Sequence, residues 1–218
     1  MTIFFIHTVS GLKEYFDTLT AEILPDADTC HLIDESIIRQ VETAGGLTSM
    51  VTERLCDHAV YAQKAGAAAV QFTCSSISPA ADIAAGKVNI PVLKVDLPMV
   101  MYAVNHFTCI GVAATVETTL GPTTELLKST AAKAGKNIVL ETRLCAGAFA
   151  AFKAGDYAGY TARIKETVNE LTVENEVIIL AQASMARALA EIDNNTAIPV
   201  LSSPRMAVEH LRQLFKQG

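Results

Sequence analysis

One short segment of this chain occurs twice, and this repeat constrains the fold more than any other feature. Ile90–Leu93 reads Ile-Pro-Val-Leu, and the same four residues recur at Ile198–Leu201, an offset of 108 in a chain of 218 residues. The position 17 residues before the proline is Cys74 in the first copy and Gln182 in the second. The repeat predicts a duplicated fold in which a thiol and an amide occupy equivalent positions.

Strand-like and helix-like segments alternate along the whole chain, which is typical of a parallel sheet with helices on both faces. The expected strands lie at 2–8, 29–34, 67–73 and 91–95 in the first half, and at 108–114, 137–142, 176–181 and 198–202 in the second. Helices are expected at Leu47–Lys64, Ser78–Ala85 and Pro204–Lys216, the last with Ser203 as its cap.

The pattern therefore predicts an α/β fold of two similar lobes, each a parallel sheet flanked by helices and related by pseudo-twofold symmetry. The lobes are expected to span residues 1–106, with Cys74, and 107–218, with Gln182. The C-terminal helix could pack across both lobes. Ligands of such sheets bind beyond the carboxyl ends of the strands, so we expect the active site in the cleft between the lobes.

Composition limits the class of protein and its partners. Half of the residues are hydrophobic and 18% are charged, but no apolar run reaches the ~18 residues of a transmembrane helix. The net charge of -6 disfavours nucleic acid or a membrane as a partner, whereas a small carboxylate substrate and a homo-oligomer, dimer or tetramer, are compatible with it. The five scattered cysteines favour a reducing cytoplasm over a disulfide framework or metal site.

Cys74 lies where an expected strand meets an expected helix. It follows Val70–Thr73 and precedes Ser78–Ala85. The positive end of a helix dipole favours a thiolate, so we expect Cys74 to have a pKa below the ~8.5 of a free cysteine and to be the most reactive of the thiols. Ser75 and Ser76 add hydroxyl and N–H groups that could hold a carboxylate. The alternative is a buried structural cysteine.

Hydroxyls also follow the first strand of each half. Thr8 and Thr115 occupy matching positions, and we interpret both as substrate-binding residues. Thr118 could bind substrate or cap a helix equally well. His7, beside Thr8, could be a general acid or base, or a hydrogen-bonded structural histidine.

Two charged residues follow the Ile-Pro-Val-Leu segments. Asp96 could position a substrate or a neighbouring group, or simply cap the next helix. Arg205 could bind a carboxylate with both arms of its guanidinium, or form a surface salt bridge. No glycine-rich nucleotide loop or zinc-binding His-Glu-x-x-His pattern is present.

Several segments, in their order and spacing, resemble the aspartate/glutamate racemase superfamily, which includes hydantoin racemases, maleate isomerases and arylmalonate decarboxylases. They are Phe72–Ser76, Ala114–Thr115 with Thr118, Leu180–Met185 and the paired Ile-Pro-Val-Leu segments. The resemblance covers essentially the whole chain and implies cofactor-independent catalysis. Two cysteines, one from each lobe, then exchange a proton at opposite faces of an acidic carbon, while hydroxyl and N–H groups hold the carboxylate.

By this resemblance Cys74 is the first cysteine, but Gln182 stands where the second is expected, followed by Ala183 and Ser184 as substrate-binding residues. An amide does not transfer carbon-bound protons readily at neutral pH. Three functions are therefore compatible with the sequence. The first is a racemase or isomerase of a small carboxylic or amino acid, with Cys74 on one face and His7, Asp96 or water on the other. The second is a decarboxylase or lyase of a malonate-type or keto acid that needs one thiol. The third is a non-catalytic carboxylate-binding protein.

Overall fold

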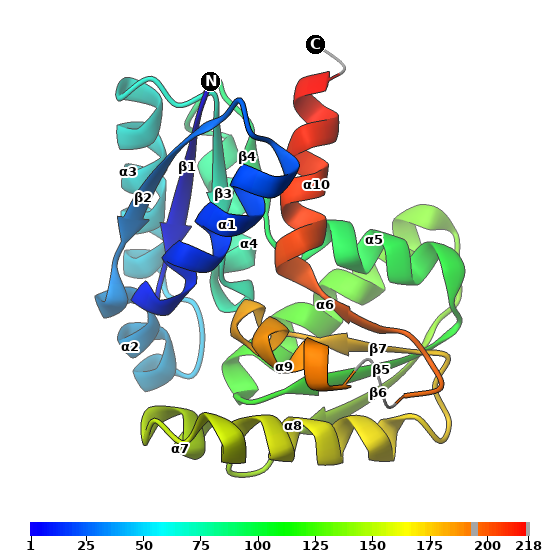
Figure 1. Cartoon of the computed structure of the whole chain (residues 1–218). Coiled ribbons are helices and arrows are strands. Elements are labelled where there is room, and N and C mark those ends of the chain that lie inside the picture. The colour runs from blue at the N-terminus through cyan, green and yellow to red at the C-terminus, as the bar shows by residue number, and fades with distance from the viewer. Residues whose placement is uncertain (193–195, 217–218) are drawn as a thin grey trace. The chain divides into compact units, whose positions relative to one another are not determined.

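The computed structural model describes residues 1–192 and 196–216, and these residues form two compact units. The first unit contains residues 1–98 together with the C-terminal segment from Pro204, and the second contains residues 99–203. Each unit has one four-stranded parallel sheet with helices around it (Figure 1). This confirms the predicted α/β class with two parallel sheets flanked by helices. None of the described helices is long and apolar enough to cross a membrane.

The first unit has the strand order β2-β1-β3-β4. Its strands are β1 (Thr2–His7), β2 (Asp28–Ile33), β3 (Ala69–Phe72) and β4 (Val92–Lys94). Its α-helices are α1 (Lys13–Ile23), α2 (Glu35–Ala44), α3 (Ser49–Lys64), α4 (Ser78–Ala85) and α10 (Ser203–Lys216). The 3₁₀ turn η1 (Ser10–Leu12) follows β1, and the 3₁₀ turn η2 (Ser75–Ile77) precedes α4.

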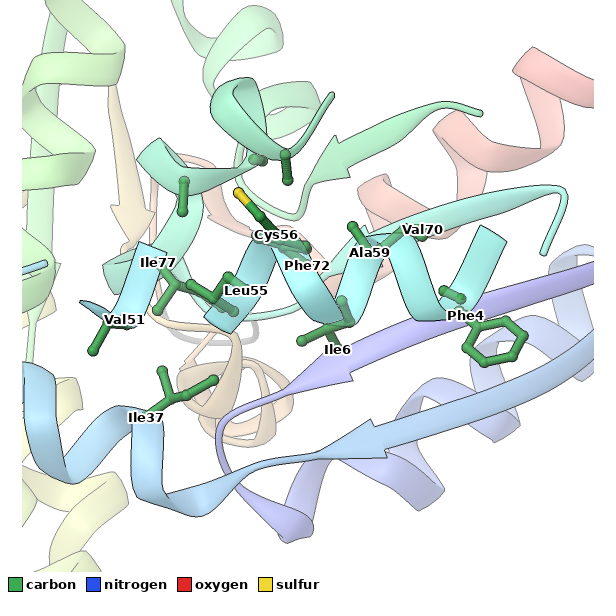
Figure 2. Close-up of a cluster of buried hydrophobic side chains, with 14 of the residues drawn as sticks. Phe4, Ile6, Ile37, Val51, Leu55, Cys56, Ala59, Val70, Phe72 and Ile77 are labelled. Carbon is green, nitrogen blue, oxygen red and sulfur yellow. The ribbon is translucent and has the colours of Figure 1, made fainter. Parts of the chain in front are cut away.

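The core of the first unit follows from the alternation of side chains along β1. Phe4 and Ile6 point to the face of the sheet that α3 covers, and both belong to the apolar cluster that also contains Leu55 of α3 (Figure 2). Phe5 points to the opposite face of the sheet and contacts Phe16 of α1, with ring centroids 5.1 Å apart. Each fully buried side chain of this size stabilises the fold by about 1.5–3 kcal/mol, so burial on both faces holds β1 at the centre of the sheet.

The second unit repeats this arrangement with the order β6-β5-β7-β8. Its strands are β5 (Cys109–Ala114), β6 (Val139–Leu144), β7 (Val177–Leu180) and β8 (Val200–Ser202). Its helices are α5 (Leu97–His106), which contains the point of division between the units, α6 (Glu117–Ala134), α7 (Ala148–Lys153), α8 (Tyr157–Leu171) and α9 (Ala186–Ile192), with the turn η3 at Ala183–Met185. Helix α8 runs along one face of the sheet and packs on β5 and β6 (Figure 1).

The internal repeat is visible in the backbone. Ile3 of β1 is in register with Ala69 of β3, and Ile110 of β5 is in register with Val177 of β7. All eight expected strands are present, with ends within two residues of those predicted. The prediction of Ser203 as a cap is wrong, because Ser203 directly follows β8 and is already the first residue of α10. Within the described part of the chain, the buried Ser203 hydroxyl has no hydrogen-bond partner.

Gly111 in β5 lies against the end of α8. A Cβ atom there would lie 3.2 Å from Asn175 Cγ and 3.3 Å from Leu171 Cβ. The Asn175 amide cannot move away easily, because it donates hydrogen bonds to Glu141 and to the Leu171 carbonyl. We expect Gly111→Ala to lower the free energy of unfolding by about 1–3 kcal/mol, measured by urea denaturation. Gly121→Ala is the control, since a Cβ there meets nothing within 4 Å, and equal losses in both variants would contradict the prediction.

Candidate active site

Cys74 lies at the carboxyl end of β3, as the last extended residue before η2, and its side chain is partly exposed. Four hydrogen-bond donors face its sulfur: the hydroxyls of Thr8 and Ser76 and the backbone N–H groups of Ser76 and Ile77. Thr8 follows β1, so two adjacent strand ends build this arrangement. The structure thus places two of the residues singled out in the sequence, Thr8 and Ser76, around the thiol of Cys74.

The predicted low pKa of Cys74 is wrong. Burial raises the pKa of the thiol above its ordinary value, and the surrounding donors oppose this rise without overcoming it. The sulfur packs against the apolar cluster that includes Phe72 and Ile77. A low-dielectric surrounding disfavours the charged form, so Cys74 is a neutral thiol near pH 7. The sequence shows the start of the helix but not the apolar cluster against which Cys74 packs in the fold.

We expect alkylation of Cys74 by iodoacetamide in the folded, ligand-free protein to show an apparent pKa above the ~8.5 of a free cysteine, because only the thiolate reacts. The measurement is the rate of modification against pH, with Cys74 followed by peptide mapping. The same peptide alkylated in guanidinium is the reference, since unfolding removes the effect of burial. An apparent pKa lower in the folded protein than in guanidinium would contradict the assignment.

Asp96 follows β4 and is completely buried. Its Oδ1 accepts a hydrogen bond of 2.7 Å from the Ser78 hydroxyl, whereas Oδ2 has no partner among the residues that the structure describes. Burial raises the pKa of Asp96 to about 6, although the hydroxyls of Ser78 and Ser75 favour its charged form. Ser75 is also buried. Both Ser75 and Asp96 therefore belong to the polar interior next to the Cys74 turn.

His7 is buried at the end of β1, and both of its ring nitrogens have partners within the protein. Nδ1 lies 2.9 Å from the Thr73 hydroxyl and Nε2 lies 2.8 Å from Nδ1 of His31. Burial, reinforced by the proximity of His31, lowers the pKa of His7 to about 3. His7 is therefore a neutral, hydrogen-bonded histidine, and its ring offers no free nitrogen to a ligand.

Gln182 occupies the place in the second unit that Cys74 has in the first. Both residues are extended and precede a 3₁₀ turn, with φ and ψ of −114° and 137° for Gln182 and −126° and 125° for Cys74. Gln182 Oε1 accepts hydrogen bonds from the N–H and hydroxyl groups of Thr115, at 2.5 and 2.9 Å. Because a backbone N–H can only donate, the side-chain oxygen must face Thr115 and the NH₂ group must face away. The contact between Thr8 and Cys74 thus has an equivalent between Thr115 and Gln182.

The other candidates in the second unit have different surroundings. Thr118 lies in the first turn of α6, and its buried hydroxyl has no partner within the described residues. Ala183 is buried and has no polar side chain to offer. The Ser184 side chain forms a hydrogen bond with Tyr160, which opposes the rise of the Tyr160 pKa to about 12 that burial causes.

Arg205 on α10 is engaged elsewhere in the first unit. Its two terminal nitrogens donate to the two carboxylate oxygens of Glu22, at 2.9 and 2.8 Å, and both side chains are exposed. This is the surface salt bridge that the sequence left as the alternative for Arg205.

Sequence reasoning missed four polar residues that form hydrogen bonds with the predicted site residues or with one another: Asp17, His31, Thr73 and Ser78. The expected strand at 29–34 could have placed His31 beside β1, because adjacent parallel strands share a register. No local signal marks Asp17, which reaches His31 from a helix 14 residues away in sequence.

Comparisons with known proteins identify the family of this chain and its fold. A family model of Asp/Glu/hydantoin racemases matches residues 8–211. The structure is similar to a glutamate racemase from Bacillus anthracis, with a TM-score of 0.78 and 17% identity over 99% of this chain and 82% of that one. It is also similar to an allantoin racemase from Klebsiella pneumoniae, with a TM-score of 0.76 and 14% identity over 100% and 89% of the two chains.

A mutant of arylmalonate decarboxylase is a third structural relative, with a TM-score of 0.61 and 17% identity over 100% of this chain and 94% of that one. A search of curated protein sequences gave no significant match. At these identities the structural likenesses concern the fold. The family model, in contrast, matches most of the sequence, and the chain belongs to the Asp/Glu/hydantoin racemase family.

Proposed function

We propose that the protein is a cofactor-independent racemase or isomerase that moves a proton at the carbon next to the carboxylate of a small carboxylic or amino acid. Its membership of a racemase family supports an enzyme of this type. The observation that carries the proposal is the Cys74 sulfur at a strand end, surrounded by donors from Thr8, Ser76 and Ile77. These donors stabilise negative charge on the sulfur, as an acid/base thiol requires.

In this mechanism the Cys74 thiol first gives its proton to water, and the resulting thiolate removes the proton from the substrate carbon. The bonding electrons of the broken C–H bond then form an enolate with the carboxylate. A proton returned to the opposite face completes inversion. Water is the favoured donor on that face, because the ring nitrogens of His7 are occupied and Asp96 is buried. Gln182 contributes a fixed N–H donor to an oxygen of the substrate, since its carbonyl oxygen is held by Thr115. That both turns act on one substrate is part of the proposal.

The second candidate is a decarboxylase or lyase of a malonate-type or keto acid, and two observations favour it. The thiol of Cys74 is neutral at rest, and the equivalent Gln182 is an amide held by Thr115. In decarboxylation the C–C bond to one carboxylate breaks, carbon dioxide leaves, and its bonding electrons remain as an enolate. One neutral thiol then protonates the carbon and is itself reprotonated by water.

Incubation in deuterium oxide distinguishes these functions. Candidate acids are first selected by thermal shift, because a ligand that binds only the folded state raises the melting temperature. A racemase exchanges the hydrogen on the reacting carbon for deuterium with loss of optical activity, and a decarboxylase releases carbon dioxide and a deuterated product. Thermal shift without either reaction would identify a carboxylate-binding protein and overturn both enzymatic candidates.

The Gln182→Cys variant tests the role of the second position. A thiol there can protonate the second face, so we expect racemisation to increase at least tenfold, or a decarboxylation product to lose its optical purity. Chiral chromatography of the product measures both effects. Gln182→Ala is the control because it removes the same amide and its contact with Thr115 without adding a thiol. Identical product ratios from the two variants would contradict the assignment of this position.

All five cysteines are free thiols, which supports a reducing compartment and, as part of the proposal, the cytoplasm. We also propose a homo-oligomer, a dimer or a tetramer, as the working assembly. Light scattering of the purified protein tests the oligomer, and a monomeric mass would overturn it.

A further inference from the structure

A chain of hydrogen-bonded side chains crosses the first unit from α1 to the end of β3. Asp17 Oδ1 lies 2.8 Å from His31 Nε2, His31 Nδ1 lies 2.8 Å from His7 Nε2, and His7 Nδ1 lies 2.9 Å from the Thr73 hydroxyl. The two imidazole rings are nearly parallel, with centroids 5.0 Å apart, and His31 also stacks on Phe5. We refer to these four residues, Asp17, His31, His7 and Thr73, as the relay.

The negative charge of Asp17 on α1 determines the donor and the acceptor in every hydrogen bond of the relay. Burial alone would raise the pKa of Asp17, but hydrogen bonds from Lys13, Thr29 and His31 lower it to about 2. A carboxylate only accepts, so His31 donates from Nε2 and, being neutral, accepts at Nδ1. Burial lowers the pKa of His31 as well. His7 must then donate from Nε2 and accept at Nδ1.

The last hydrogen bond of the relay comes from the Thr73 hydroxyl. This hydroxyl lies 2.9 Å from both His7 Nδ1 and the Ile6 carbonyl oxygen. The Ile6 carbonyl, which also accepts the Thr73 N–H at 3.1 Å, and His7 Nδ1 are both within reach of the single hydroxyl hydrogen. Because His7 Nδ1 carries no hydrogen in this tautomer, Thr73 and His7 form their hydrogen bond when the hydroxyl donates to His7. The relay therefore links the residue before Thr8 to the residue before Cys74, and Thr8 and Cys74 are themselves in contact.

The second unit shows that the fold does not require the relay. The residues equivalent to His7 and Thr73 are Ala114 and Ala181, and neither can form such hydrogen bonds. The strand ends are nevertheless held in the same way, since Ala181 N–H donates to the Ala113 carbonyl at 2.9 Å just as Thr73 N–H donates to Ile6. The unit with the thiol has the relay, and the unit with the amide folds without it.

We propose that Asp17, His31, His7 and Thr73 form a positioning relay that holds Thr8 against the sulfur of Cys74. By fixing His7 in one neutral tautomer, the carboxylate of Asp17 makes Nδ1 a permanent acceptor for Thr73. This fixes the peptide units on either side of the contact between Thr8 and Cys74. The role that the relay serves in catalysis rests on the proposed function, but its effect on the thiol does not.

The test compares substitutions that each keep one of the two hydrogen-bonding positions of the His7 ring. In His7→Asn the side-chain oxygen takes the place of Nδ1 and still accepts from Thr73, whereas in His7→Gln the amide reaches toward His31 instead. Thr73→Ser keeps the hydroxyl, and Thr73→Val keeps the shape without it. Thr20→Val is the matched control, because Thr20 is a buried threonine of the same unit whose hydroxyl has no partner among the described residues.

The readout is the pH profile of Cys74 alkylation in protein shown by circular dichroism to be folded. We expect His7→Gln and Thr73→Val to raise the apparent pKa of Cys74 by about half a unit or more, a threefold loss of thiolate below that pKa. His7→Asn, Thr73→Ser and Thr20→Val should retain the wild-type profile. A wild-type profile for Thr73→Val would overturn the proposal, and this variant decides the matter even if the His7 variants do not fold.

Alkylation requires no substrate, so the relay and the proposed function can fail separately. If the relay acts as proposed but the protein turns over no acid, the Thr73→Val shift persists and only the proposed function is overturned. If the enzyme is active and Thr73→Val leaves the thiol unchanged, the relay alone is overturned.

Discussion

Replacing Cys74 by Ala is expected to lower turnover of the true substrate by roughly a thousandfold or more, the range in which positioned acid/base groups act. The variant keeps Ser75, Ser76 and the N–H groups of the turn, which are the groups proposed to hold the carboxylate. Ligand affinity and the melting temperature should therefore change little. Turnover is measured by the deuterium and chiral assays, and affinity by thermal shift.

A serine at position 74 should also be severely impaired, because a hydroxyl is far less acidic than a thiol and relays protons poorly near pH 7. Cys30→Ala is the control, since Cys30 is a partly exposed thiol on β2 of the same unit. If Cys74→Ala retained near-normal activity, the thiol mechanism would be wrong.

The arrangement of strands could be predicted because it depends on patterns that the sequence repeats. The two Ile-Pro-Val-Leu segments and the buried strands before them have the same spacing in both halves, and parallel strands buried on both faces are continuous apolar runs. The equivalence of Cys74 and Gln182 follows from that spacing alone, and the structure gives both residues the same backbone conformation.

The electrostatics of the site could not be predicted in the same way. The start of a helix suggested a thiolate at position 74, but burial by residues distant in the sequence has the larger effect on the pKa. The partner of Gln182 is 67 residues away, and only the fold shows that Thr115 holds its oxygen. His7 was recognised as important, but its role depends on His31, which only the register of β1 and β2 brings near.

The pH dependence of stability is expected to change strongly when Asp96 is replaced by Asn. Burial raises the pKa of Asp96 to about 6, against about 3.8 in the unfolded chain. Between these pH values the folded state binds the proton and the unfolded state does not. Raising the pH through this window therefore lowers the free energy of unfolding, by roughly 3 kcal/mol in total.

The titration of His7 changes the free energy of unfolding in the opposite direction and partly cancels the effect of Asp96 in the wild type. Its pKa is about 3 in the folded state, lowered mainly by burial, and about 6.5 in the unfolded chain. The unfolded state binds the proton in that window, so the contribution of His7 is present above pH 6.5 and is lost as the pH falls toward 3. Between pH 4 and pH 6 the two slopes offset each other, and a wild-type profile alone does not separate them.

The difference between Asp96→Asn and wild type isolates the carboxyl, because His7 contributes equally to both proteins. The free energy of unfolding of the variant minus that of wild type should be roughly 3 kcal/mol higher at pH 8 than at pH 4. Urea denaturation at half-unit pH steps measures it, with Asp82→Asn as the control because Asp82 is an exposed carboxylate paired with Lys94. At low pH the variant and wild type both present a neutral group to Ser78, so any constant offset from the new amide cancels in the comparison. A difference that does not vary with pH would show that Asp96 is ionised in the folded protein as readily as in water, and that the polar interior beside the Cys74 turn carries a charge.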